Sequence, residues 1–237
     1  VFNVMVRRAL LVGITYKDDE KPLKASANNT ILVKHILSTR FRFRSKNVKV
    51  MIDQPSKKST RTKRYLKIRN PLNSAVIIEN LQQMIRNAKS GDQLVFMISG
   101  HSLVDDNNGS VLGFLTGPDK DGSGSYLSTD QLQTMLSLIP PDTKQISVSD
   151  DNLGIIFASA ENACYSAYYR KWRCHVSDFV LALITAIEED KNVGNMELIQ
   201  KIDEFLKNRY EKDQKSEEEE EEEEVVDEGV QQPSLYC

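Results

Sequence analysis

The sequence is poor in cysteine and has no apolar stretch of membrane-spanning length. Its 237 residues include only Cys164, Cys174 and Cys237, at spacings that match neither a disulfide framework nor a zinc site. The chain is therefore not a small secreted domain stabilised by disulfides, and a reducing intracellular setting is expected. Apolar runs fall well short of about 20 residues, and no signal-peptide pattern opens the chain. We expect a cytoplasmic protein, or a nuclear one, without a membrane partner.

Negative charge is concentrated in one segment. Residues 217–224 are eight consecutive glutamates, followed by Asp227 and Glu228. Removing these ten from the 34 acidic residues leaves 24 against 31 basic residues, so the rest of the chain carries a net charge of +7. A glutamate run repels itself and buries no apolar area. We expect residues 211–230 to be a solvated acidic loop or linker, with an acidic docking tail as the alternative.

A basic segment interrupts the body of the chain. Seven of the thirteen residues from Lys57 to Arg69 are Lys or Arg. A nucleic-acid site would interleave aromatic residues with the basic ones, and only Tyr65 does so here. We therefore expect a solvated insertion over residues 54–72 rather than a nucleic-acid partner.

Strand and helix patterns alternate along residues 1–210. Strands are expected at Arg8–Tyr16, Val48–Ile52, Asp92–Ser99, Gln145–Ser149 and Gly154–Ser159. Helices are expected at Ala27–Thr39, Ala75–Ala88 (with Ser74 as N-cap), Thr129–Leu138, Val176–Glu188 and Met196–Arg209. Leu103–Tyr126, rich in Gly, Asp and Asn, is expected to be a long loop. This alternation predicts an α/β fold with a mostly parallel sheet flanked by helices.

The most informative segment is Gly91–Ser102, in which a continuous apolar run ends in Ser-Gly-His. Such a run predicts a strand covered on both faces. The glycine permits a sharp turn, so the His101 imidazole is expected at the carboxyl edge of the sheet, where open α/β folds keep their sites. A histidine placed there is a candidate general base.

Taken in order, these segments resemble the caspase-like peptidases, most closely the plant type I metacaspases. Gly91–His101 is similar to the strand that bears the family's catalytic histidine. The other similar segments are Arg7–Tyr16, Leu23–Asn29 (the family's Leu-Lys-Gly-x-x-Asn-Asp), His35–Phe43 and Gln231–Leu235. The resemblance implies a caspase-like three-layer sandwich over residues 1–210, with residues 231–237 as a remnant of the family's C-terminal segment.

The resemblance also implies an activity: cleavage of peptide bonds after Arg or Lys by a His–Cys dyad, mostly with calcium. His101 matches the dyad histidine. The family's cysteine lies in Asp-x-Cys-His-Ser-Gly, after the strand that follows the third helix. In this chain the matching position is Asp151 or Asn152, depending on the register. Neither residue can supply the thiolate that acyl transfer requires, so catalysis by the family mechanism is not expected.

Cys164 is the alternative nucleophile, because Glu161–Ser166 faintly resembles the family's nucleophile motif. Ile156–Ala160 and Ser166–Ala167, however, are more similar to the family's next strand and the segment after it. This alignment makes Cys164 an ordinary small residue. Cys174 and Cys237 are weaker candidates.

The pocket that the resemblance implies for a basic side chain has also changed. Asn29 stands at the position of one family aspartate, and the second falls on Ser149 or Asp150. An amide in place of a carboxylate loses the charge-assisted pair with a guanidinium. No metal site is expected, because Asp106–Leu112 has lost most of the family's acidic loop. Asp119, Asp121 and Gly122 resemble only half of a calcium loop.

The sequence therefore predicts a metacaspase-like protein that is non-catalytic and acts by binding in proteolysis or programmed cell death. Its expected partners are proteins, either active metacaspases or their substrates. The alternative is an active cysteine-type endopeptidase cleaving after Arg or Lys, with His101 as base and Cys164 as nucleophile. A decaying gene copy without a selected role is a third, weaker hypothesis.

Overall fold

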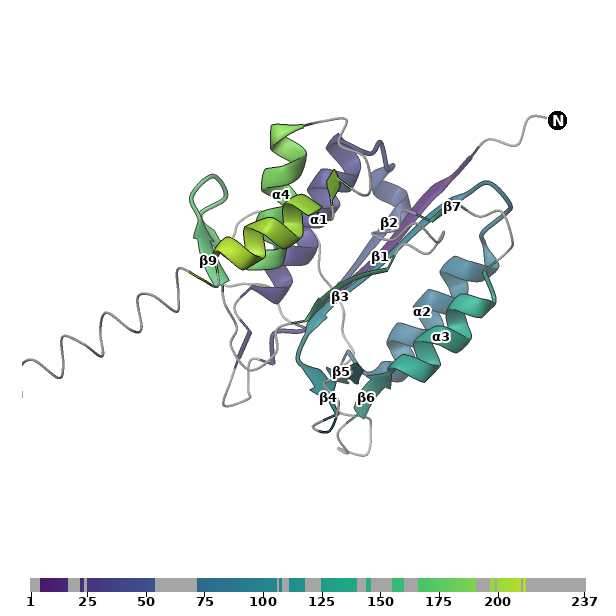
Figure 1. Cartoon of the computed structure of the whole chain (residues 1–237). Helices are drawn as coiled ribbons and strands as arrows, with labels where there is room; N and C mark the ends of the chain where they lie inside the picture. Colours follow the sequence, from purple (N-terminus) through teal and green to yellow (C-terminus); the bar gives the residue numbers. More distant parts are fainter. Residues whose placement is uncertain are drawn as a thin grey trace, which may run out of the picture.

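Five parallel strands form the central sheet of the computed structural model (Figure 1). They are β1 (Arg7–Gly13), β2 (Val48–Ile52), β3 (Gln93–Gly100), β7 (Lys144–Gln145) and β8 (Ile155–Ser159). The structure describes residues 5–16, 22–23, 25–53, 72–105, 107, 111–117, 125–139, 144–145, 155–159, 166–190, 197–198, 200–209 and 211.

The strand order places β3 in the middle of the sheet. β1 pairs with β2 on one side and with β3 on the other. The other edge of β3 is shared by two strands, because β7 pairs with Gln93 and Leu94 whereas β8 pairs with Phe96–Gly100. The two strands expected after the third helix therefore continue one another along β3.

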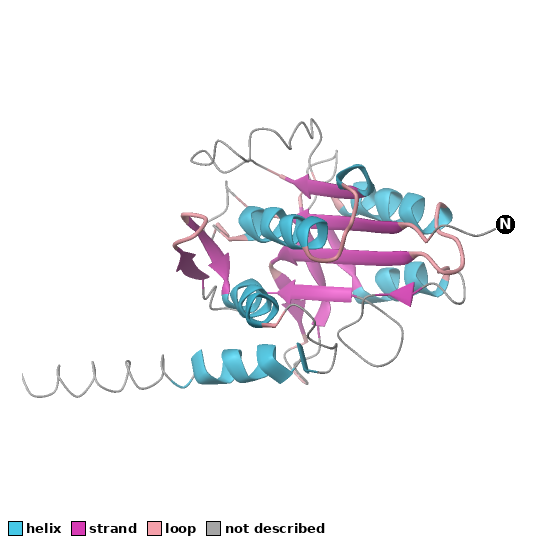
Figure 2. Ribbon diagram, turned by 90° about the horizontal axis from the view of Figure 1, so that it is seen from above, coloured by secondary structure: helices cyan, strands magenta, loops and turns pink. Residues whose placement is uncertain are grey.

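Helices cover both faces of the sheet, which makes a three-layer sandwich (Figure 2). α1 (Ser26–Thr39), α4 (Asp178–Glu189) and the helical residues 197–198 and 200–209 pack on one face. α2 (Ser74–Arg86) and α3 (Thr129–Ser137) pack on the other.

Alternating side chains of the central strands fill the two cores. Leu11 and Met97 pack with α1 and α4, whereas Val12 and Ile98 pack with α2 and α3. This alternation is the consequence of the two-residue period of a strand. The continuous apolar runs in the sequence thus correctly predict a sheet buried on both faces.

The prediction of a long loop over Leu103–Tyr126 is wrong. β4 (Ser102–Val104), β5 (Val111–Thr116) and β6 (Ser125–Ser128) form a separate antiparallel sheet. Phe114 and Leu127, paired across β5 and β6, are both buried against the α2 and α3 side of the core. Burial of these two side chains outweighs the turn-rich composition around them.

The expected helix over Val176–Glu188 begins too early. Cys174–Ser177 is strand β10, which pairs antiparallel with β9 (Ser166–Tyr169). The Ser177 hydroxyl accepts a hydrogen bond from the Val180 amide and caps α4, so the helix starts at Asp178. Similarly, the N-cap of α2 is Asn73, which accepts from the Val76 amide, rather than the predicted Ser74.

Several predicted segments lie mostly outside the described residues. Of the basic insertion 54–72 the structure describes Leu72, which is buried. Of the acidic segment 211–230 it describes residue 211, and of residues 231–237 none. Within the part that is described, no helix has the length and apolar character needed to cross a membrane.

Candidate functional site

His101 follows β3 directly, at the carboxyl edge of the parallel sheet, as the sequence predicts. Its side chain is half-buried. The backbone carbonyl of His101 accepts a hydrogen bond from the Leu115 amide at 2.9 Å. β3 therefore sets the position of the imidazole, and the small antiparallel sheet supports the backbone that carries it.

Tyr16 is the principal neighbour of His101, and the sequence analysis did not identify it. The Tyr16 hydroxyl accepts from the His101 backbone N–H at 3.0 Å and donates to the Leu115 carbonyl at 2.6 Å. The two rings also contact, with centroids 4.6 Å apart and planes tilted by 37°. The sequence did contain a signal for this contact. Tyr16 comes shortly after β1 and His101 directly after β3, and neighbouring parallel strands end at the same edge of the sheet.

Gly100 makes room for this contact. A Cβ atom at position 100 would lie 2.7 Å from the Tyr16 hydroxyl oxygen, which is closer than such atoms approach. A larger residue at position 100 would therefore have to displace the Tyr16 hydroxyl from its place beside the His101 backbone.

Asp53, the residue after β2, fixes the backbone of Tyr16. Its Oδ2 accepts from the backbone N–H groups of Thr15 at 2.8 Å and Tyr16 at 3.0 Å. Its Oδ1 accepts from the Thr15 hydroxyl at 2.9 Å. These bonds hold Tyr16 at a φ of 48°, a left-handed conformation that residues other than glycine rarely adopt. Three consecutive strand ends, of β2, β1 and β3, therefore build the site.

Asn29, the predicted pocket residue, is only 1% exposed and uses its amide inside the protein. Its Nδ2 donates to the hydroxyls of Ser99 and Ser177, both at 3.0 Å, and its Oδ1 accepts from the Ser177 N–H at 3.0 Å. The bond to Ser99 places Asn29 close to His101, because Ser99 lies two residues before the histidine in the sequence. Asn29 therefore lies near the histidine, but as a tie between α1, β3 and the start of α4.

The predicted nucleophile positions, Asp151, Asn152 and Cys164, lie outside the described residues, as do Asp150 and Cys237. The strand that runs beside the end of β3 is β8, with Ser159 paired to Gly100. Neither β7 nor β8 contains a cysteine, and the sequence has none between α3 and Cys164.

Cys174 is the cysteine that the structure does describe. It belongs to β10, where it is half-buried and packs against the core formed by α1 and α4. Burial raises the pKa of the Cys174 thiol. The thiol is therefore protonated at neutral pH and a poor nucleophile.

Of Asp106–Leu112, the segment that resembles the family's acidic loop, the structure describes Asn107, Val111 and Leu112. Asp105 supplies one carboxylate, and its Oδ1 already accepts from the backbone N–H and the side-chain amide of Asn107, each at 2.9 Å. Calcium takes six to eight oxygen ligands, commonly from several carboxylates. Asp106, Asp119 and Asp121 lie outside the described residues. Among those that are described, no three His, Cys, Asp or Glu side chains gather as a metal site would require.

In chemical terms, the described site offers a half-exposed imidazole that is held in place by a phenol. An imidazole can move a proton, but peptide cleavage by acyl transfer also needs a nucleophile within hydrogen-bond reach. Neither β7 nor β8, the strands that pair with β3 on its far edge, carries a cysteine that could take this role.

Comparison with solved structures supports the architecture. The structure matches caspase-1 from Spodoptera frugiperda with a TM-score of 0.51 at 12% sequence identity. The match covers 85% of this chain and 76% of the insect protein. At this identity the likeness establishes the caspase-like fold and not the activity.

Comparison of sequences supports the family. The chain is 25% identical over 162 residues to metacaspase-1 of Plasmodium falciparum, a match that covers 68% of this chain and 24% of the relative. It is 26% identical over 149 residues to metacaspase-2 of Arabidopsis thaliana, covering 61% of this chain and 33% of the relative. The chain thus spans a quarter to a third of the length of these relatives. A sequence profile described as "Metacaspase, peptidase C14 domain" matches residues 7–153, more than half of the chain. The chain therefore belongs to the metacaspase family of C14 peptidases.

Proposed function

We propose that this chain is a non-catalytic member of the metacaspase family that acts by binding other proteins in proteolysis or programmed cell death. One observation carries the proposal. His101 and the residues that hold its backbone are present, whereas no cysteine occurs on β7 or β8 or anywhere between α3 and Cys164. A scaffold that keeps its fold without its nucleophile can still bind.

The chemistry of the replaced position supports the same proposal. A carboxylate or an amide at Asp151 or Asn152 forms no acyl-enzyme suited to hydrolysis at neutral pH. His101 alone could activate water only weakly, because acid–base catalysis contributes about 10²–10⁴-fold and peptide hydrolysis needs far more.

Active relatives are the better candidates for the partner than their substrates. Recognition of an Arg or Lys side chain needs a carboxylate that is free to pair with it. The amide of Asn29 is instead committed to Ser99 and Ser177 inside the protein. We therefore infer that selective binding of basic peptides has been lost together with cleavage, and that contact with a second metacaspase is the retained role.

The proposal is tested by two assays on the purified full chain. Alone, it should release no fluorophore from Arg- or Lys-terminated peptides, with or without calcium. Added to an active metacaspase, it should change that enzyme's rate at least twofold in a saturable manner, whereas an equal mass of albumin should not. Turnover by the chain alone that disappears in Cys164→Ala would overturn the proposal and establish the endopeptidase alternative. Absence of both turnover and association would point to a chain without a selected role.

A further inference from the structure

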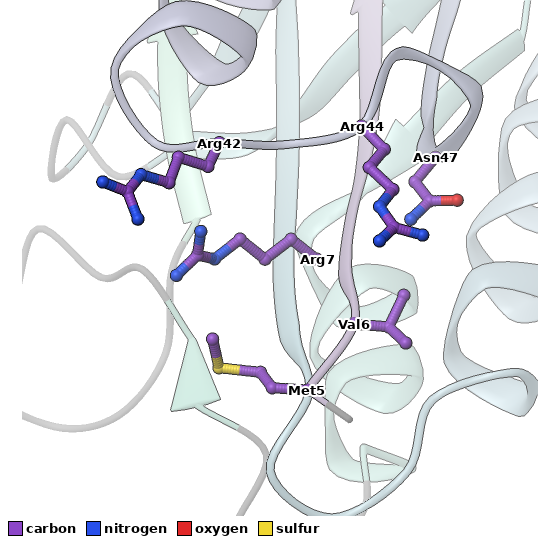
Figure 3. Close-up of a pocket in the computed structure, with 6 residues that line it drawn as sticks. All are labelled: Met5, Val6, Arg7, Arg42, Arg44 and Asn47. Carbon is purple, nitrogen blue, oxygen red and sulfur yellow. The ribbon is translucent and has the colours of Figure 1, made fainter. Parts of the chain in front are cut away.

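A cavity of about 230 Å³ lies at the end of β1 opposite to His101. Its walls are the residues at the start of β1 and those that follow α1 (Figure 3). The lining residues are Met5, Val6, Arg7, Arg42, Arg44 and Asn47. Three arginines thus line one small cavity at the amino edge of the sheet.

Arg7 is fixed in this cavity by bonds inside the protein. Its Nε donates to the side chain of Gln93 at 2.6 Å, and its Nη1 donates to the Phe41 carbonyl at 2.8 Å. Figure 3 shows the Arg7 side chain between Arg42 and Met5, with Arg44 beside Asn47. A guanidinium held in this way loses little side-chain entropy when it binds a ligand.

Arg42 is presented by an unusual backbone conformation. Its φ is 57°, in the left-handed region that costs a residue other than glycine on the order of 1 kcal/mol. The next residue, Phe43, is buried, and its N–H donates to the Leu37 carbonyl at 2.9 Å. Burial of Phe43 therefore holds the turn that directs Arg42 outward.

The three arginines have no acidic counterpart in the part of the chain that the structure describes. None of the described residues that line the cavity is a carboxylate, and none of the described ion pairs involves Arg7, Arg42 or Arg44. Asp92, the carboxylate bonded to this end of β1, pairs with Arg8 instead. Grouped guanidiniums without a counter-charge repel one another, and binding of a planar carboxylate in bidentate geometry relieves that repulsion.

We propose that the cavity lined by Arg7, Arg42 and Arg44 is a docking site for the glutamate run 217–224 of this protein. The run supplies eight adjacent carboxylates, and the rest of the chain carries a net charge of +7. A tethered segment whose linker spans the distance to its site acts at an effective concentration in the millimolar range, so that several individually weak ion pairs together suffice to hold it. The sequence alone favoured a solvated linker because the run repels itself and buries no apolar area, with an acidic docking tail as the alternative.

The primary test measures the reactivity of the pocket arginines in the full chain. Phenylglyoxal modification is followed residue by residue by mass spectrometry, in the wild type and in a variant with all eight glutamates of 217–224 changed to glutamine. Arg42 and Arg44 should react at least threefold faster in the glutamine variant. The exposed Arg86 and Arg170 should react equally in both chains. Equal reactivity of Arg42 and Arg44 in the two chains would overturn the proposal.

A reciprocal test changes the arginines of the cavity and measures how fast a protease cleaves the glutamate run. Cleavage of the full chain within 217–224 by a glutamyl endopeptidase should be at least threefold faster in Arg42→Gln/Arg44→Gln than in wild type. Arg86→Gln/Arg170→Gln, which removes the same charge elsewhere, should behave as wild type. Equal acceleration by both pairs would show a general charge effect and contradict a site.

Dilution shows whether the glutamate run in the cavity belongs to the same chain or to a second copy of the protein. Protection that persists through about a hundredfold dilution places the run of the same chain in the cavity, whereas protection lost on dilution places the run of a second copy there. In either case about 1 M salt, where the screening length falls to about 3 Å, should abolish the protection.

Discussion

Tyr16 and His101 are joined both through the backbone and through their rings. The Tyr16 hydroxyl accepts from the His101 N–H at 3.0 Å, and the ring centroids lie 4.6 Å apart. The tyrosine is itself held by Asp53, so the end of β2 fixes the residue that supports the end of β3. This support of the His101 backbone is present in a chain whose sequence has no cysteine between α3 and Cys164.

Removal of the Tyr16 hydroxyl should weaken the protein. Tyr16→Phe loses the bonds to the His101 N–H and the Leu115 carbonyl, at a cost of about 1–2 kcal/mol. The expected result is a lower urea midpoint with an unchanged denaturant slope. Tyr126→Phe, on a side chain that is 51% exposed, serves as the control and should leave the midpoint in place.

Gly100→Ala should be destabilising in a way that depends on Tyr16. The new Cβ would meet the Tyr16 hydroxyl oxygen at 2.7 Å, whereas the next nearest atom, the ring carbon that bears it, lies at 3.6 Å. We expect a cost of about 1–3 kcal/mol in the wild type and clearly less in the Tyr16→Phe background. A double-mutant cycle measures the difference. Additive effects would show that the two residues do not contact one another.

Restoring the family's aspartate at position 29 should destabilise this chain at neutral pH. Asn29→Asp would bury a carboxylate in a site that is 1% exposed, where the amide now donates to Ser99 and Ser177. Burial favours the neutral form of an acid and so raises its pKa above the unfolded value of about 3.9. The stability of the variant should therefore be close to wild type at pH 4 and fall as the pH rises through the folded-state pKa.

Denaturation of Asn29→Asp and of the wild type at several pH values measures whether the buried carboxylate destabilises the protein. A loss of about 1–3 kcal/mol at pH 7 that shrinks in acid is expected. Wild-type stability of the variant at pH 7 would instead mean that position 29 opens onto a hydrated pocket, as the family resemblance implies.

Asp92 should contribute an acid-sensitive part of the stability. Burial by itself would raise the pKa of Asp92, but the hydrogen bonds from the Val6 and Lys89 N–H groups and the pairing with Arg8 outweigh it and lower the pKa. A carboxyl with a lowered folded-state pKa stabilises the protein above its unfolded pKa of about 3.9, and the contribution is lost as the pH falls through the folded value.

Comparison of wild type with Asp92→Asn isolates that contribution. The variant should be less stable at pH 7, by about 1–3 kcal/mol, because the pair with Arg8 is lost. Its stability should also fall less steeply below pH 4 than that of the wild type. Parallel pH profiles of the two proteins would contradict the role assigned to Asp92.

The sequence predicted the central sheet and its helices because their signals are local. The apolar runs at β1, β2 and β3 are continuous, and α1 and α2 carry apolar residues at helical spacing. The position of His101 followed from a strand that ends in glycine. These features depend on a few adjacent residues, and no distant contact overrides them.

The missed elements depend on contacts between distant segments. β4 and β6 are three and four residues long, and β5 pairs with both across segments rich in turn residues. Val176 continues the apolar spacing of α4, so only the pairing of β10 with β9 shows that it is a strand residue. Likewise, the roles of Tyr16 and Asp53 require knowledge that three strands end together.

The sequence predicted that His101 lies at the end of β3, but not how the candidate site residues contact their neighbours. Sequence similarity identified His101 and Asn29, but the burial of Asn29 between Ser99 and Ser177 arises from the packing of α1 against β10 and the start of α4. The arginine cavity escaped the sequence analysis for the same reason, since Arg7 is distant in sequence from Arg42 and Arg44. Convergence of residues from separate segments is a property of the folded chain.

The most direct test of the proposed loss of the nucleophile is covalent trapping. The purified full chain is incubated with an electrophilic arginyl-ketone inhibitor, beside an active metacaspase, and the intact mass of each protein is measured. The account predicts complete labelling of the active relative and no adduct on this chain, including at Cys174, whose pKa is raised by burial. A stoichiometric adduct on Cys164 that is lost in His101→Ala would contradict the account and establish a working dyad.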